Sequence, residues 1–65
     1  MNDDEFRQEA ARLAQLPARQ RNEALAVHWR IAEDARLSSA TRDHARKVAE
    51  TLERLIKALL ARRRK

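Results

Sequence analysis

The chain contains no glycine and a single proline, Pro17, in 65 residues. Glycine adopts positive φ angles at little cost, so its absence disfavours tight β-hairpin turns, phosphate-binding loops and dinucleotide-binding fingerprints. Thirteen residues are alanine, the best helix former. The sequence therefore predicts an all-α protein, with residues 1–65 forming one small domain.

Large apolar side chains are scarce. Leu, Ile, Val and Phe together make up 13 of the 65 residues, which is close to the lower limit for a self-sufficient core. The chain has no cysteine for a disulfide, and its two histidines do not suggest a metal site. We therefore expect no cofactor, and a homo-oligomer (most simply a homodimer) or a complex with another protein as the source of further stability.

Three helical segments are predicted, at residues 3–16, 18–37 and 40–63. Pro17 separates the first two, because a proline disfavours helical geometry in the residue before it. Ser38 and its neighbour Ser39 separate the last two, because serine caps helix starts. The expected fold is a short N-terminal helix followed by an antiparallel helical hairpin, completed as a homodimeric helical bundle. The alternative is one bent helix from Ala18 onward.

The second and third segments each carry an apolar stripe at helical spacing, with Trp29 at the edge of one stripe. The candidates for self-association or partner docking are Val27, His28, Trp29, Ile31, Val48, Leu52, Leu55, Ile56, Leu59 and Leu60. Trp29 is interpreted as a large side chain that closes the gap between two helices, with a partner hot spot as the alternative. His28 is interpreted as a core or interface histidine with one or two hydrogen bonds, and His44 as a surface residue. At a dimer seam, His28 would make assembly weaken on acidification.

The polar side of the third segment also has a helical pattern. Acid-before-base pairs at four-residue spacing predict ion pairs along it: Asp43 with Lys47, Glu50 with Arg54, and Glu53 with Lys57.

The net charge of +5 lies mostly in a basic tail at residues 62–65, because residues 1–61 carry eleven basic and ten acidic side chains. The candidates for nucleic-acid contacts are Arg54, Lys57, Arg62, Arg63, Arg64 and Lys65. A solvated helix end that complements the helix dipole is the simpler interpretation of the tail. A membrane-surface role is the weakest of the three.

No hydroxyl is placed with a base and an orienting group, so we expect no catalytic residue and no enzymatic activity. Neither a secretory signal nor an apolar run of membrane-spanning length is present, which favours a cytoplasmic protein. The sequence thus predicts a small helical interaction or regulatory protein that acts through its apolar helix faces. A basic nucleic-acid-binding protein of low sequence specificity is the alternative.

Overall fold

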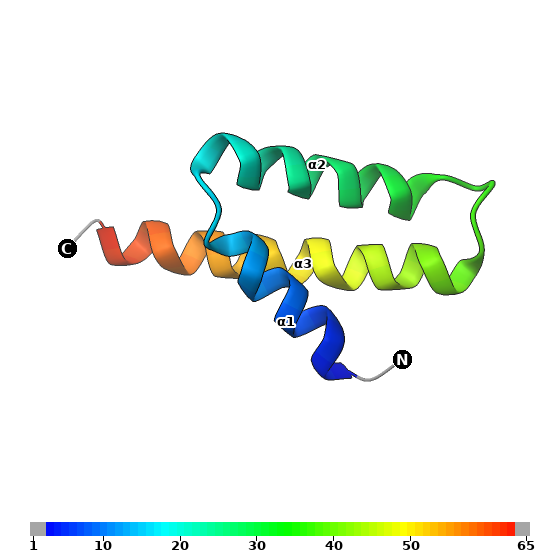
Figure 1. Cartoon of the computed structure of the whole chain (residues 1–65), viewed down its shortest axis with the longest axis horizontal. Coiled ribbons are helices and arrows are strands. Elements are labelled where there is room, and N and C mark those ends of the chain that lie inside the picture. The colour runs from blue at the N-terminus through cyan, green and yellow to red at the C-terminus, as the bar shows by residue number, and fades with distance from the viewer. Residues whose placement is uncertain (1–2, 64–65) are drawn as a thin grey trace.

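The computed structural model describes residues 3–63 and contains three helices, α1 (Asp3–Ala14), α2 (Ala18–Glu33) and α3 (Ser39–Arg63), with no strand in that range. This confirms the all-α prediction. In Figure 1, α2 and α3 run side by side in opposite directions, and α1 lies across α3. No described residue has a positive φ, so both connections are made without the conformations that glycine would favour.

The break between α1 and α2 lies where the sequence places it, but α1 ends two residues earlier than expected, at Ala14 rather than Leu16. The N–H groups of Gln15 and Leu16 donate to carbonyls only three residues back, at 3.2 and 3.1 Å, which closes the helix in a tighter turn. Pro17 follows with φ −53° and ψ 149° and caps α2. Pro17 therefore restricts not only Leu16, the residue directly before it, but also the last turn of α1.

The end of α2 differs more from the prediction, because the helix stops at Glu33 and not at Leu37. Asp34 accepts hydrogen bonds from the backbone N–H of Arg36 at 3.0 Å and from its guanidinium at 3.1 Å. Such local side-chain bonds compete with the helix. The side-chain hydrogen bonds from Arg36, and then its backbone N–H, hold the pKa of Asp34 below its ordinary value, while Asp34 raises the pKa of Arg36.

The predicted serine break is confirmed, and the alternative of one bent helix is wrong. The Ser38 Oγ accepts a hydrogen bond from the N–H of Thr41 at 3.2 Å, the bond expected of a helix N-cap. The Ser38 hydroxyl also donates to the Thr41 Oγ1 at 2.9 Å. With Ser38 as the cap, α3 begins at Ser39, one residue before the predicted start.

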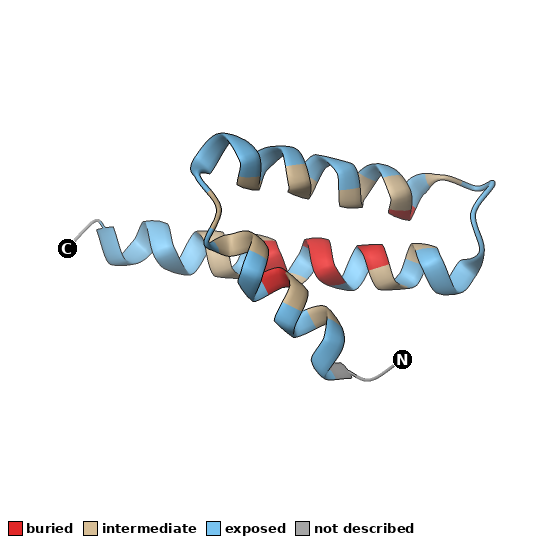
Figure 2. Ribbon diagram, in the orientation of Figure 1, coloured by how far each residue is buried: buried red, intermediate tan, exposed pale blue. Residues whose placement is uncertain are grey.

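The core lies where the three helices face one another, as the buried segments in Figure 2 show. The buried apolar residues are Ala10, Ala32, Ala45, Val48, Ala49 and Leu52. Four of these are alanines, which let helix backbones approach closely. Val48 and Leu52, proposed above as partner-facing residues, are 0% exposed within the single chain. They are therefore core residues and are not part of an exposed docking face.

Candidate protein-interaction site

An open apolar groove of about 500 Å³ lies between the C-terminal end of α1 and the C-terminal half of α3. Its apolar lining consists of Ala11, Ala14, Leu55, Ala58 and Leu59, and Gln15 and Arg62 are its polar members. Small side chains line the hollow, Ala11 and Ala14 from α1 and Ala58 from α3, and they leave part of the space between the two helices unfilled. Concave apolar surfaces of this kind are typical binding sites.

The end of α3 beside the groove is uncovered. Every residue from Lys57 to Arg63 is exposed, and in Figure 1 this end of α3 extends beyond the start of α2. Leu59 is 38% and Leu60 51% exposed. The sequence predicts both residues at a partner face, and both are exposed, but only Leu59 lines the groove.

A second, smaller depression of about 210 Å³ lies further toward the N-terminal end of α3. It is lined by Phe6, Arg7, Lys47, Glu50, Thr51 and Arg54. At 100° per residue, Lys47, Thr51, Arg54, Ala58 and Arg62 fall within about 80° of one another on α3, while Glu50 and Leu59 lie at the two edges of this surface. We call the residues lining the two hollows the α1–α3 face.

Two cations are held over one ring within this face. The Arg7 guanidinium lies 5.9 Å and the Lys47 ammonium 5.8 Å from the centroid of Phe6, within the range of cation–π attraction. Arg54 and Arg62 follow Lys47 along the same side of α3. The face therefore combines an apolar groove with four basic side chains, Arg7, Lys47, Arg54 and Arg62, and one acidic side chain, Glu50.

The ion pairs predicted along α3 are wrong. Among residues 4–63 the ion pairs are Glu9 with Arg12, His28 and His44, and Asp34 with Arg36. Within that part of the chain, no carboxylate lies at ion-pair distance from Lys47, Arg54 or Arg62. Glu50 lines the same depression as Lys47 and Arg54 but lies beyond ion-pair distance of both, so the described part of this surface keeps an excess of positive charge.

The charge is concentrated at this end of the chain. After Glu53 there are six basic residues and no acid, whereas residues 1–53 carry nine basic and ten acidic side chains. Arg62 lines the groove and Arg54 lines the smaller depression, whereas Lys57 and Arg63 line neither hollow. The proposed nucleic-acid contacts within the described range are thus exposed but do not form one stripe. Arg64 and Lys65 lie outside the described residues.

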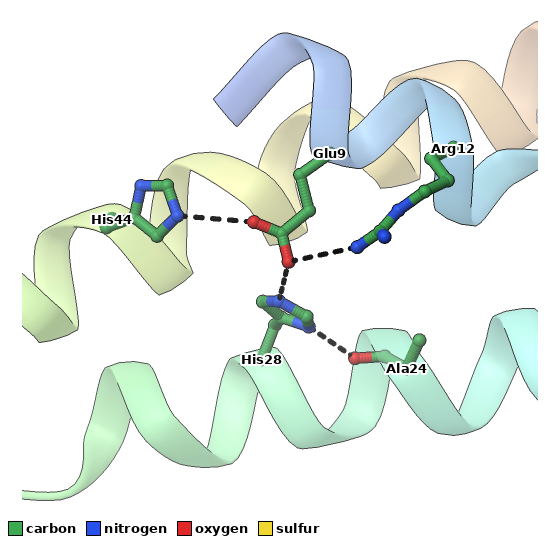
Figure 3. Close-up of polar contacts among 5 residues, drawn as sticks. All are labelled: Glu9, Arg12, Ala24, His28 and His44. Atoms are coloured by element: carbon green, nitrogen blue, oxygen red, sulfur yellow. Dashed lines mark hydrogen bonds and ion pairs between the residues drawn. The ribbon is translucent and has the colours of Figure 1, made fainter. Parts of the chain in front are cut away.

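The two histidines meet at one carboxylate, which sequence reasoning did not anticipate. Glu9 of α1 lies 3.6 Å from the Nε2 of His28 on α2 and 3.4 Å from the Nε2 of His44 on α3, as Figure 3 shows. The Nδ1 of His28 donates to the carbonyl of Ala24 at 2.8 Å, which confirms the expected hydrogen-bonded histidine. His44 is half-buried, and its contact with Glu9 goes beyond the interpretation of His44 as a surface residue.

This cluster joins the three helices to one another. Among the described residues, no group of three His, Cys, Asp or Glu side chains is arranged to hold a metal ion. His28 faces Glu9 of its own chain, so its ring is committed to an intramolecular contact. A dimer seam is not needed to explain the position of His28 on the apolar stripe.

The remaining predicted interface residues are divided between the core and the surface. The Trp29 Nε1 donates to Glu53 at 2.7 Å and joins α2 to α3, in line with the gap-closing interpretation. Leu55 and Ile56 pack partly against the core. Ile31 of α2 is half-buried and Val27 is 45% exposed, so neither contributes to the α1–α3 face.

None of the described helices is long and apolar enough to cross a membrane. Comparisons with protein-family models, with curated proteins and with solved structures gave no match. The function is therefore argued from the residues of this chain.

Proposed function

We propose that this chain is a non-enzymatic interaction protein in which the hairpin of α2 and α3, braced by α1, presents the α1–α3 face to a helix of another chain. The observation that carries the proposal is the apolar groove, in which the lining residue Leu59 is 38% exposed. Exposed leucines at a concave surface are typical of helix-in-groove recognition.

The two histidines and the tryptophan make contacts within the chain, which supports the choice of the α1–α3 face as the binding surface. His28 and His44 contact Glu9, and Trp29 contacts Glu53. Of the large hydrophobic residues that stay exposed in the described range, Leu59 and Leu60 lie at the end of α3, whereas Val27 lies on α2 and Leu37 in the loop after it. A second copy, giving the homodimeric bundle expected from the sequence, and a different protein are the two kinds of occupant.

Site-specific photocrosslinking in cells tests the proposal. A photoreactive residue replaces Ala58 in the groove, and in a matched variant it replaces Ala26, an exposed alanine of α2. We expect a discrete product from position 58, identified by mass spectrometry as a second copy or one other protein, and none from position 26. Adding Leu59→Asp should abolish the product. Equal crosslinking from both positions, or none from position 58, would overturn the proposal.

Nucleic-acid binding is the second candidate, supported by the six basic residues after Glu53. Their distribution around the helix makes simultaneous contact with one phosphate backbone less favourable than contact with a partner on the groove side. Deleting residues 62–65 should remove salt-sensitive retention of duplex DNA if this candidate is correct.

A further inference from the structure

We propose that the occupant of the α1–α3 face is an acidic amphipathic helix of another protein. The inference rests on the proposed function and adds the chemistry of the partner. It requires one partner surface that offers apolar side chains to the groove and carboxylates to the basic side chains.

The geometry of α3 sets the pattern of this partner. Lys47, Arg54 and Arg62 are separated by seven and eight residues, or about 10 and 12 Å along the helix axis. A partner helix of about four turns, lying along α3, spans this distance. Because two helical turns separate successive cations, carboxylates about seven residues apart on one side of the partner can reach all three.

Electrostatics favours an acidic partner because, among the described residues, the α1–α3 face carries four basic side chains and one acidic side chain. Lys47, Arg54 and Arg62 have no carboxylate at ion-pair distance among residues 4–63. Arg7 lies beside Lys47 across the ring of Phe6, which places two positive charges at one end of the face. Complementary charge speeds association and selects the partner.

A second copy is the less suitable occupant. A two-fold dimer through this face joins the same patch of both copies. It would bring together two segments that each carry six basic residues and no acid. The repulsion between them opposes the dimer, whereas an acidic helix removes it.

The phosphates of duplex nucleic acid can pair with the cations, but duplex nucleic acid has no apolar side chains to bury in the groove. Phosphates gain nothing from the alanines and leucines of the groove, whereas an amphipathic helix buries its apolar side chains there. The apolar groove and these cations lie on the same side of α3, and a single partner that uses both is the most economical explanation of their arrangement.

Binding of synthetic peptides to the full chain tests the inference by fluorescence anisotropy. The probes are labelled 18-residue helical peptides with an apolar stripe of Leu, Phe or Trp and glutamates beside the stripe. We expect at least one of these peptides to bind. A version with every glutamate replaced by glutamine should bind at least tenfold more weakly, and a version with an alanine stripe should not bind.

Paired variants locate the binding site. Arg54→Glu with Arg62→Glu should weaken binding at least tenfold, whereas Arg30→Glu, at an exposed position of α2, should change it little. Ala58→Glu should block the groove, whereas Ala61→Glu makes the same charge change on an exposed residue outside the groove lining. Circular dichroism confirms that each variant keeps its helix content.

Three results would overturn the inference. The first is that no acidic peptide binds, or that the glutamine version binds equally well. The second is that a 20-base-pair duplex or phosphatidylserine vesicles bind more tightly than any peptide, with Ala58→Glu and Ala61→Glu equivalent. The third is a homodimer that Ala58→Glu dissociates and the peptides do not. This last result refutes the acidic partner but leaves the proposed docking function intact.

Discussion

At the scale of single residues, Glu9 has the most connected side chain in the structure. An ionised carboxylate only accepts hydrogen bonds, so each nitrogen that contacts it attractively must carry a proton. The Nδ1 proton of His28 is used by Ala24. The ring nitrogen of His28 that remains to contact Glu9 is the Nε2, at 3.6 Å.

Replacing this carboxylate should loosen the packing of all three helices. We expect Glu9→Gln to lower the free energy of unfolding by less than about 1 kcal/mol, since the contacts with Arg12 and His44 that it weakens are long and only partly buried. Urea denaturation followed by circular dichroism measures the loss. Glu5→Gln is the control, because Glu5 is an exposed residue one turn earlier on α1. Equal losses in the two variants would show that the cluster contributes nothing to the packing.

Asp34, unlike Glu9, makes its side-chain contacts within one short segment, the loop after α2. Hydrogen bonds from Arg36 lower its pKa in the folded chain, so the unfolded chain takes up a proton at higher pH than the folded one. Asp34 therefore stabilises the fold above its unfolded pKa of about 3.9, and this contribution is lost as the pH falls through the lower folded pKa.

We accordingly expect wild type to be more stable than Asp34→Asn at pH 6 and the difference to shrink below about pH 4. Thermal unfolding across this range measures the effect. Asp43→Asn is the control, because the exposed Asp43 of α3 makes none of these hydrogen bonds within the described part of the chain. A difference that does not depend on pH would show that the Asp34–Arg36 bonds do not persist in solution.

At the scale of elements, the sequence predicts the breaks between helices better than their ends. Pro17 and Ser38 act through their own backbone and side-chain chemistry, which is visible in the sequence. The early end of α2 depends on whether Asp34 bonds to Arg36 or to solvent, and a helical pattern that continues to Leu37 does not reveal this. Local competition of this kind decides helix ends.

The candidate site was only partly predictable for a related reason. Leu59 and Leu60 belong to a visible apolar pattern, but whether they are covered depends on where α1 crosses α3. Ala11 and Ala58 contribute to the groove because their small side chains leave space unfilled. An alanine in a sequence does not show whether a neighbouring side chain fills that space. The contact of His44 with Glu9 was not predicted because the two residues lie 35 positions apart in sequence. These features follow from tertiary packing, on which periodicity along one helix carries no information.

At the scale of the whole molecule, the shape and the charge are both asymmetric. The chain measures 42 × 23 × 15 Å, and the end of α3 that extends past α2 is also the end that carries the excess positive charge. The acids and bases of residues 1–53 nearly balance. An approaching anionic partner is therefore steered toward the groove end of α3.

The same asymmetry separates the leucines that form the fold from those available for binding. Leu52 is 0% and Leu60 51% exposed, on the same helix. Leu52→Ala leaves a cavity that costs about 2–5 kcal/mol, a large part of the ~3–10 kcal/mol expected for a chain of this size. Leu60→Ala removes exposed surface and should cost less than about 0.5 kcal/mol.

Thermal unfolding by circular dichroism, at two protein concentrations, measures both effects. We expect Leu52→Ala to be largely unfolded or to melt far below wild type, and Leu60→Ala to melt close to wild type at both concentrations. A concentration-dependent loss in Leu60→Ala would instead mean that a second copy covers this leucine. The comparison therefore reports both where the core ends and whether the exposed end of α3 is free to receive a partner.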